Sequence, residues 1–231
     1  MDGLWLLRHG ALPPNPQRRF VGAREIALSD AGREQVRRAA RALLAECGVA
    51  QAGPVMRPVP ERADMPGPVT AVAGGPATLP RRIVCSDLGR CRESAALVRE
   101  VFRGYGHDVD IFPDAALREI SLGGWEGLTV AEVEARWPGS HAARGAAMAD
   151  FTPPGGESFA GVQARAVACV ERWRSRFSGE CLLLVSHAGV LRTLLCHWLA
   201  LPLREVMRVP QHYACRMWLP SWPEGRSPLQ A

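Results

Sequence analysis

Leu4-Trp5-Leu6-Leu7-Arg8-His9-Gly10 is the stretch that decides the fold, because four consecutive apolar residues end abruptly in two polar ones. An apolar run without polar alternation is typical of a strand covered on both faces, as in the parallel sheet of an α/β domain. Such a strand delivers Arg8 and His9 to its carboxyl end, where open α/β sheets bind ligands. Gly10 removes a side chain directly after them, so the backbone can turn and another group can approach the imidazole.

The Arg8-His9 pair has two interpretations. In the first, Arg8 is a surface charge and His9 is a loop histidine with satisfied hydrogen bonds, which is the usual case for an arbitrary Arg-His pair. In the second, Arg8 binds a phosphate group through two parallel hydrogen bonds, and neutral His9 attacks its phosphorus. The tripeptide does not decide between them, so the rest of the chain must supply the other parts of such a site.

Length and composition are those of one globular α/β domain with additions. The chain has 231 residues, of which 47% are hydrophobic and 22% charged, and it can bury one sizeable core. The net charge of +5 suits an anionic ligand, but the basic residues are scattered and no nucleic-acid-binding module is present. All 28 basic residues are arginines, which excludes a lysine nucleophile, a Schiff base and a P-loop lysine.

The cysteines and the hydropathy pattern predict a cytoplasmic protein. Seven cysteines, an odd number without a C-x-x-C pair, predict reduced and mostly buried thiols. The N-terminus does not read as a signal peptide, and no apolar run approaches the ~18 residues that a membrane span needs. No histidine pair has metal-ligand spacing, so we infer neither a metal site nor a cofactor. Nothing in the sequence separates a monomer from a homodimer.

A second unit of strand, polar turn and helix supplies another arginine. Ile83-Val84-Cys85 reads as a short buried strand, and Ser86-Asp87-Leu88-Gly89-Arg90-Cys91-Arg92 leads from it into a helix. The carboxyl ends of parallel strands share one edge of a sheet, so this turn faces the same side as His9. Arg90 or Arg92 is then a second clamp for an anion, but not both, because residues two apart on a helix point in different directions.

A third unit contains a second histidine. Cys181 to Val185 is the most apolar strand, and we expect it in the middle of the sheet. It ends in Ser186-His187-Ala188-Gly189, and we expect a helix from Val190 to about Leu201. His187 therefore lies where a strand meets the amino end of a helix, which is the position of an anion-binding loop. A helix cap is the alternative role, but the symmetry with His9 favours contact with a ligand.

The remaining candidates are carboxylates and one amide. Glu119 and Glu126 lie among Leu, Ile and Trp residues, and a half-buried Glu119 is able to hold a proton near neutral pH, as a general acid must. The alternative is that both carboxylates pair with arginines and cap loops. Asn15, between two prolines after Gly10, is able to donate to a phosphate oxygen. Glu157 begins a helix, and we expect it to complement the helix dipole.

The less regular segments complete a single predicted domain over residues 1–220. Residues 48–82 are rich in proline, glycine and alanine, which predicts a flexible insertion. Residues 139–154 read as a helical or irregular excursion, and such a segment over the carboxyl edge of the sheet would form a lid or a wall that determines specificity. Residues 213–219 read as a closing strand and 221–231 as a disordered tail. The other expected elements are a helix over 29–48, a strand over 108–112, a short helix opened by a capping box at Thr129, and a long helix after Gly155.

Together these residues form a complete set for phosphoryl transfer, and their order along the chain resembles a known family. One imidazole serves as nucleophile, two guanidiniums and a second imidazole neutralise the phosphoryl oxygens, and a carboxylic acid protonates the leaving oxygen. The chain resembles the histidine phosphatase superfamily, in the branch that contains cofactor-dependent phosphoglycerate mutase. The motifs are R-H-G at 8–10, S-D-L-G-R-C at 86–91, L-R-E at 117–119 with G-W-E-G at 124–127, and S-H-A-G at 186–189.

The resemblance covers nearly the whole chain except the insertion and the tail. It implies a three-layer α/β/α sandwich with a mostly parallel central sheet, and it selects Arg90 over Arg92. It implies a pocket made of His9 as phosphorylated nucleophile, Glu119 as proton donor, and Arg8, Asn15, Arg90 and His187 as phosphate ligands.

Three functions follow from the resemblance. The first is a metal-independent phosphomonoesterase of the histidine acid type, acting on a small phosphorylated metabolite. The short segment between Glu119 and Glu157 and the Cys91-Arg92 step favour it, since they look more like phosphatases of the α-ribazole phosphate type than like glycolytic mutases. The second is a phosphoglycerate mutase, an isomerase active only with a bisphosphoglycerate primer. The third is a silent phosphate-binding protein, which requires a damaged motif, and every motif is intact.

Overall fold

The structure is a computed structural model that describes residues 3–49 and 77–222. Its centre is a five-stranded sheet in the order β3-β2-β4-β1-β5. Its strands are β1 (Leu4–Arg8), β2 (Arg82–Ser86), β3 (Asp110–Asp114), β4 (Leu182–Ser186) and β5 (Arg216–Leu219). All neighbours pair in parallel except β5, which pairs antiparallel with β1. The predicted mostly parallel sheet is confirmed, and β4 is its central strand.

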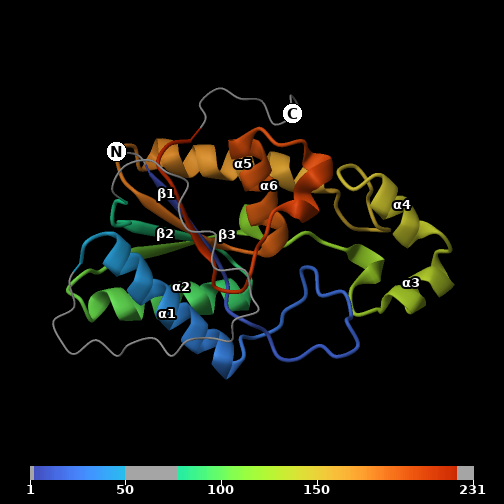
Figure 1. The fold of residues 1–231 in the computed structure, drawn as a ribbon, viewed down its shortest axis with the longest axis horizontal. Helices are drawn as coiled ribbons and strands as arrows, with labels where there is room; N and C mark the ends of the chain where they lie inside the picture. Colours follow the sequence, from blue (N-terminus) through green and yellow to red (C-terminus); the bar gives the residue numbers. More distant parts are fainter. Residues whose placement is uncertain (1–2, 50–76, 223–231) are drawn as a thin grey trace.

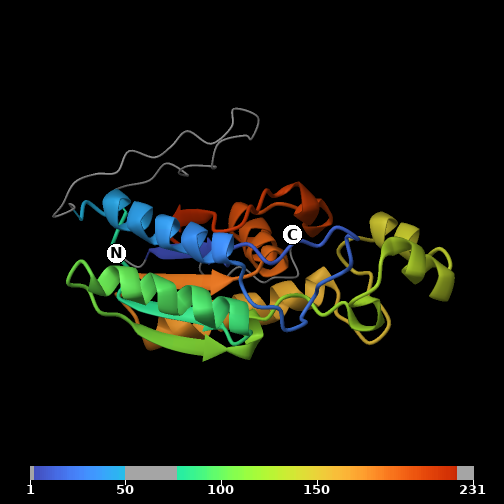
Figure 2. The same cartoon turned by 90° about the horizontal axis from the view of Figure 1, so that it is seen from below.

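Helices cover both faces of the sheet, which confirms the predicted three-layer sandwich (Figures 1 and 2). One face carries α1 (Asp30–Glu46) and α2 (Gly89–Arg103), and the other carries α5 (Phe159–Arg176) and α6 (Ala188–Leu199). Alternate residues of β1 enter the two cores, with Leu4 and Leu6 on the α5/α6 side and Trp5 and Leu7 on the α1/α2 side. Because both faces of β1 are buried, its sequence is apolar without alternation.

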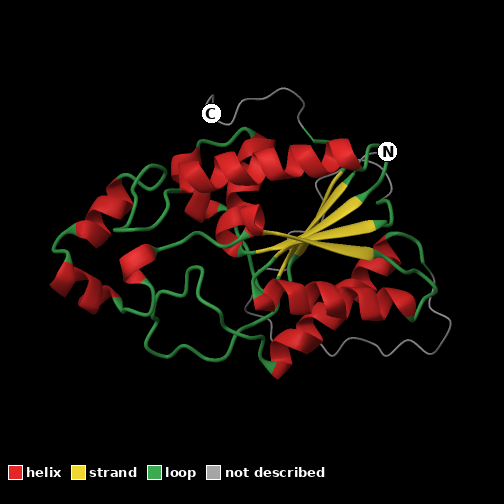
Figure 3. Ribbon diagram, turned by 180° about the vertical axis from the view of Figure 1, so that it is seen from behind, coloured by secondary structure: helices red, strands yellow, loops and turns green. Residues whose placement is uncertain are grey.

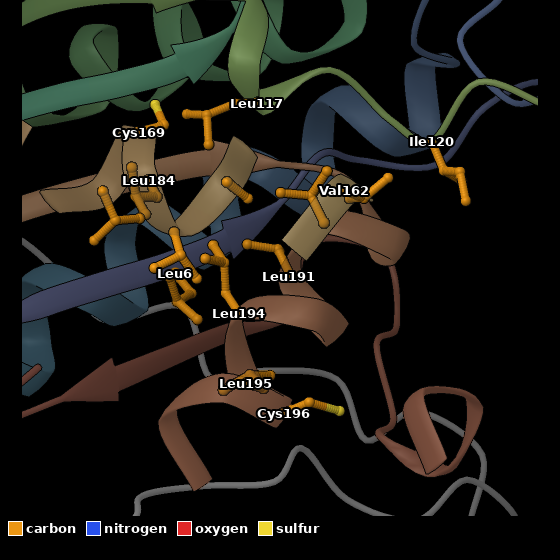
Figure 4. Packing of buried hydrophobic residues seen from close by; sticks show 14 of the residues in the cluster. Leu6, Leu117, Ile120, Val162, Cys169, Leu184, Leu191, Leu194, Leu195 and Cys196 are labelled. Atoms are coloured by element: carbon orange, nitrogen blue, oxygen red, sulfur yellow. The ribbon is translucent and has the colours of Figure 1, made fainter. Parts of the chain in front are cut away.

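The core between the sheet and α6 fixes the position of α6 at the carboxyl ends of the strands. Figure 4 shows Leu6 and Leu184 of the sheet among Val162 of α5 and Leu191 and Leu194 of α6. Each of these side chains is at most 2% exposed. Close packing of this kind leaves α6 little freedom to shift, so its amino end stays beside the end of β4.

Two short helices stand beyond the carboxyl ends of the strands, as Figures 1 and 3 show. They are α3 (Val130–Arg136) and α4 (Ser140–Ala146). The predicted capping box is present at the start of α3, where Thr129 and Glu132 bind each other's backbone N–H groups. The excursion expected over 139–154 therefore begins with a helix. Shorter 3-10 turns occur at Ala115–Leu117, Gly123–Trp125 and Leu203–Arg208.

Several element boundaries differ from the sequence-based expectation. The strand expected over 108–112 is β3 at Asp110–Asp114, because Asp108 instead binds Arg103 and its own neighbour's N–H in the turn before it. The helix expected from Val190 begins at Ala188, directly after His187. The closing strand is limited to β5, since the residues before it form a turn.

Short parts of the predicted insertion and of the predicted tail lie among the described residues and pack on the domain. Residues 50–76 of the insertion and 223–231 of the tail lie outside the described residues. At the end of the insertion, the carbonyl of Thr78 accepts a hydrogen bond of 2.9 Å from the indole of Trp5. At the start of the tail, Trp222 is 5% exposed and the carbonyl of Ser221 accepts from the indole of Trp198 at 2.6 Å. Aromatic side chains thus extend the packed domain at both places.

None of the helices in the described part of the chain has both the length and the apolar character of a membrane span. The seven cysteines are all free, and five of them are buried.

Candidate active site

The ends of two neighbouring strands bring the turns that contain His9 and His187 together. β1 and β4 pair in register from Leu4 opposite Leu182 to Arg8 opposite Ser186, and the N–H of His9 donates to the carbonyl of Ser186 at 3.0 Å. The rings of His9 and His187 consequently lie edge to face, with centroids 5.2 Å apart. The parallel register places both imidazoles at one edge of the sheet.

His9 is held as a neutral ring with one free nitrogen. It is 3% exposed, and its Nδ1 lies 2.7 Å from the carbonyl oxygen of Gly10. A carbonyl can only accept, so Nδ1 carries the proton and Nε2 keeps its lone pair. Burial, followed by the positive charge of Arg8, lowers the pKa of His9 to about 3. A neutral imidazole with a free Nε2 is a nucleophile across the physiological pH range.

Gly10 permits the close packing that this turn requires. A Cβ on Gly10 would lie 2.2 Å from the carbonyl oxygen of Gly32, in the first turns of α1. The absence of a side chain therefore lets the helix lie directly against the turn that orients His9.

Arg8 presents its guanidinium to the same edge. Its Nη1 donates to the carbonyl of Gln211 at 2.6 Å, and its Cζ lies 3.9 Å from the ring centroid of Tyr213. The cation–π contact restrains the plane of the guanidinium. Its Nε is buried and has no hydrogen-bond partner among the described residues. An unpaired arginine donor beside a nucleophile is suited to an oxyanion of a ligand.

Arg90 is the second buried guanidinium of the site. It is 1% exposed, and its three nitrogens donate to His187 Nδ1 at 3.1 Å, the carbonyl of Arg24 at 2.6 Å and the carbonyl of Gly22 at 3.0 Å. All three acceptors are neutral, so its positive charge is not compensated by them. Arg92, by contrast, is exposed on the other side of α2.

His187 lies behind Arg90 and does not line the pocket. Arg90 donates to its Nδ1, so the proton of the neutral ring is on Nε2, which donates to Ser86 Oγ at 2.8 Å. The residue is fully buried, and burial, followed by the charge on His9, lowers its pKa well below the ordinary range. Because β2 and β4 are neighbours, Ser86 Oγ lies within hydrogen-bonding distance of His187 Nε2. His187 here orients Arg90.

Glu119 faces His9 across the pocket from a loop that precedes α3. Its two carboxylate oxygens lie 3.1 and 3.2 Å from the N–H of Gly189, in the first turn of α6, and its Oε1 also accepts from Ile120 N–H at 3.0 Å. The positive end of the α6 dipole faces the same carboxylate. The glycine at position 189 leaves room for this contact, since a Cβ there would lie 2.4 Å from Glu119 Oε1 and would require the carboxylate to move.

Arg165 and Glu157 form a clamp on the backbone of the Glu119 loop. Arg165 donates to the carbonyls of Ala116 at 2.7 Å and Arg118 at 2.8 Å, and it forms an ion pair with Glu157 at 2.8 Å. Glu157 in turn accepts from the N–H of Ser121 at 2.9 Å. Burial raises the pKa of Glu157, but these hydrogen bonds outweigh it and hold the pKa below its usual value. Glu157 is therefore more than a dipole partner of its helix.

Two candidates lie outside this group. The side-chain amide of Asn15 donates to the carbonyl of Arg19 at 2.7 Å and accepts from its N–H at 3.0 Å, in an exposed loop. Its position between prolines closes this loop, and the amide does not line the pocket. Glu126 accepts from the N–H groups of Ala23 and Leu122, so it caps loops, as the alternative interpretation proposed.

The assembled groups surround a pocket of about 140 Å³. Its lining consists of Arg8, His9, Leu12, Val21, Gly22, Arg90, Glu119 and Tyr213. Within the described ranges, no three His, Cys, Asp or Glu side chains are grouped so as to share a metal ion. A free imidazole nitrogen, two guanidiniums and a carboxyl group around one small pocket are the elements of a phosphoryl-transfer site.

Tyr213 and the clamp are the parts that sequence reasoning missed. The sequence does contain a signal for Tyr213. A strand that pairs antiparallel with β1 begins at the carboxyl end of β1, so the residues just before that strand lie at the same sheet edge as His9. No feature of the sequence distinguishes Arg165, since it lies within a helix that contains several other arginines.

A family model described as histidine phosphatase superfamily (branch 1) matches residues 4–53 and 76–229. The chain is 31% identical over 196 residues to the bifunctional protein Rv2228c of Mycobacterium tuberculosis, covering 83% of this chain but only 43% of that protein. It thus spans less than half the length of that relative. It is 31% identical over 206 residues to the glucosyl-3-phosphoglycerate phosphatase of Mycolicibacterium vanbaalenii, covering 86% of this chain and 75% of that one.

Other comparisons agree with these. The adenosylcobalamin/alpha-ribazole phosphatase of Salmonella typhimurium is 33% identical over 140 residues, covering 58% of this chain and 64% of that one. Among solved structures, YhfR of Bacillus stearothermophilus has a TM-score of 0.68 and 28% identity, covering 93% of this chain and 88% of that one.

Proposed function

The chain belongs to branch 1 of the histidine phosphatase superfamily, and from this premise we propose that it is a phosphomonoesterase acting on a small phosphorylated metabolite through a phosphohistidine on His9. One observation carries the proposal: the proton on His9 Nδ1 is held by Gly10, which leaves Nε2 free beside two guanidiniums without carboxylate partners. The relatives that are named phosphatases support hydrolysis as the reaction class.

The first step transfers the phosphoryl group to the enzyme. The lone pair of His9 Nε2 attacks phosphorus, and the bond between phosphorus and the ester oxygen breaks. Glu119, entering as the carboxylic acid, gives its proton to the departing oxygen, so the product leaves as an alcohol and Glu119 becomes a carboxylate. The N–H of Gly189 stabilises that carboxylate at 3.1 Å. Arg8 and Arg90 neutralise the charge on the phosphoryl oxygens during transfer, and the mechanism proposed needs no metal ion.

The second step returns the enzyme to its starting state. A water molecule attacks the phosphorus of phosphohistidine while the Glu119 carboxylate takes a proton from it. The bond between phosphorus and Nε2 breaks, and its electron pair returns to the imidazole. Inorganic phosphate then leaves. Throughout both steps the hydrogen bond from Nδ1 to Gly10 keeps the ring in one tautomer and one orientation.

The site belongs to a single domain in this proposal, since both cores flank the one sheet that carries it. The free cysteines support a reducing, cytoplasmic location.

A screen of phosphorylated metabolites that measures free phosphate and isomerised product together tests the proposal. We expect release of stoichiometric phosphate from at least one small phosphate monoester without a primer. Transfer within the substrate that depends on a bisphosphorylated primer, with little free phosphate, would instead identify a mutase. If neither product forms from any compound, including p-nitrophenyl phosphate, only a phosphate-binding role would remain.

A further inference from the structure

Glu126 makes two contacts that the proposed mechanism does not use. Its Oε1 accepts from the N–H of Ala23 at 2.8 Å and from the N–H of Leu122 at 3.0 Å. Ala23 lies in the loop between β1 and α1, and Leu122 follows Glu119 in the loop before α3. A single carboxylate oxygen thus joins two segments that are distant along the chain and that each hold a residue of the pocket.

The first of these hydrogen bonds orients a peptide group that binds Arg90. The N–H of Ala23 and the carbonyl of Gly22 belong to one planar trans peptide, in which they point in opposite directions. The carbonyl accepts from Arg90 Nη2 at 3.0 Å. Glu126 therefore holds this peptide by its N–H in the orientation that directs its carbonyl at the guanidinium.

Gly22 leaves the space that this carboxylate occupies. Its φ is +54°, in the left-handed region, and a Cβ at this position would lie 2.2 Å from Glu126 Oε1. A glycine reaches this φ without strain, but it also reaches many others. Without the hydrogen bond to Glu126, the peptide after Gly22 would be free to turn its carbonyl away from Arg90.

The second hydrogen bond holds the loop that carries Glu119. The N–H of Leu122 and the carbonyl of Ser121 also belong to one peptide, and this carbonyl accepts from the N–H of Glu157 at 2.8 Å. The peptide is therefore fixed at both ends, by Glu126 and by the segment before α5. Only Ile120 separates Glu119 from Ser121, so the position of this peptide limits where the Glu119 carboxyl group can lie.

Both links depend on the acceptor oxygen of Glu126 and not on an ion pair. Among the described residues no arginine forms an ion pair with Glu126, whereas Glu157 pairs with Arg165 at 2.8 Å. The second carboxylate oxygen of Glu126 takes part in neither hydrogen bond. An uncharged side chain of the same length with one acceptor oxygen would therefore preserve both links.

We propose that Glu126 is a positioning residue that couples Arg90 to Glu119 by holding the backbone that supports each of them. This proposal rests on the proposed function, in which Arg90 binds the phosphoryl group and Glu119 protonates the ester oxygen. The two side chains act on oxygens of the same phosphorus, so their separation has to match the substrate. A misplacement of about 1 Å can cost roughly 100-fold in rate, and a direct link between the two supports prevents it.

The test compares three variants of Glu126 with one control. Glu126→Ala removes both links, and Glu126→Asp keeps the charge on a side chain that is too short to reach both N–H groups. Glu126→Gln removes the charge but keeps the acceptor oxygen at the same length. Glu134→Ala is the matched control, because Glu134 also accepts from two N–H groups, those of Gly139 and His141 at 2.7 and 2.8 Å, in a connection between α3 and α4 that does not line the pocket.

Two measurements report on the two links. The dissociation constant of inorganic phosphate, measured by calorimetry, reports on Arg90. The ratio of kcat for p-nitrophenyl phosphate to kcat for glycerol 3-phosphate reports on Glu119, because only the second leaving group needs a proton. In Glu126→Ala and Glu126→Asp we expect each quantity to rise roughly tenfold, since backbone donors lose their acceptor. Glu126→Gln and Glu134→Ala should stay within about threefold of the wild type in both.

The outcomes separate this proposal from the proposed function. If Glu126→Ala changes neither quantity or only one of them, or if Glu126→Gln loses as much as Glu126→Ala, the coupling role is overturned and the phosphatase proposal stands. If circular dichroism shows that Glu126→Ala does not fold, the comparison of Glu126→Gln with Glu126→Asp makes the same decision. A wild type that releases no phosphate from either substrate would overturn the phosphatase proposal itself, and an unchanged phosphate dissociation constant in Glu126→Ala would then overturn the coupling role as well.

Discussion

Arg165→Ala provides a test of how Glu119, the proposed proton donor, is held. The substitution removes a guanidinium that does not line the pocket but binds the carbonyls of Ala116 and Arg118, in the turn that leads into Glu119. It also leaves Glu157, which accepts from the N–H of Ser121, without its ion-pair partner. The loop that carries Glu119 would then lose its hydrogen bonds to α5 before the carboxyl group, and after it Ser121 would be bound to a Glu157 that has lost its ion-pair partner.

The magnitude follows from the bonds that are lost. Hydrogen bonds to a charged group contribute about 1.5–3 kcal/mol each, but this ion pair is partly exposed, so we expect a loss of about 2 kcal/mol in the free energy of unfolding. General acid catalysis contributes roughly 10²–10⁴-fold to a rate. A displaced Glu119 would still provide part of this rate enhancement. We therefore expect kcat to fall roughly 10- to 100-fold for an alkyl phosphate, whose leaving oxygen needs a proton.

The assay compares two substrates with the same phosphoryl group. p-Nitrophenolate leaves without a proton, so p-nitrophenyl phosphate should lose less than about threefold in kcat while glycerol 3-phosphate loses the full amount. Arg172→Ala is the matched control, because Arg172 lies two turns further along α5 and pairs with Asp114, away from the pocket. It should lower stability without changing the ratio of the two rates. Equal losses for both substrates in Arg165→Ala would refute a positioning role and leave the clamp merely structural.

Three further predictions concern the nucleophile and the proton donor. His9→Ala should abolish phosphate release and acid-labile labelling by a radioactive substrate while circular dichroism shows an intact fold; retained turnover would contradict the role of His9. Since the pKa of His9 is about 3 in the folded protein and about 6.5 in the unfolded chain, the unfolded state binds more protons between these values. The free energy of unfolding should therefore fall as pH drops from about 6.5 towards 3, by roughly 3–5 kcal/mol from this residue alone, and chemical denaturation of His9→Asn should show a shallower pH dependence. Gly189→Ala places a Cβ 2.4 Å from Glu119 Oε1 and should displace the carboxylate, lowering kcat for alkyl phosphates at least roughly tenfold, whereas Gly145→Ala, with nothing near its Cβ, should leave kcat unchanged.

The local pattern of the sequence was sufficient to predict the layers of the fold. Apolar runs of strand length without alternation require cover on both faces, and β1, β2 and β4 are buried in that way. Parallel strands share one carboxyl edge, so Arg8, His9 and either Arg90 or Arg92 were predicted to meet. The family resemblance selected Arg90, and Arg8, His9 and Arg90 line one pocket. Capping at Thr129 was predicted for the same local reason, since a side chain satisfies backbone donors within three residues of itself.

Only the tertiary structure decided which partner each polar atom takes. His187 ends a strand as predicted, but its two nitrogens bind Arg90 and Ser86, because β2 lies beside β4 in the strand order. Asn15 closes its own loop, and Trp222 binds the start of the tail to the domain. Hydrophobic periodicity is a property of neighbouring residues and is therefore present in the sequence. Hydrogen-bond pairing and charge compensation depend on groups that are distant along the chain and meet only when the layers pack.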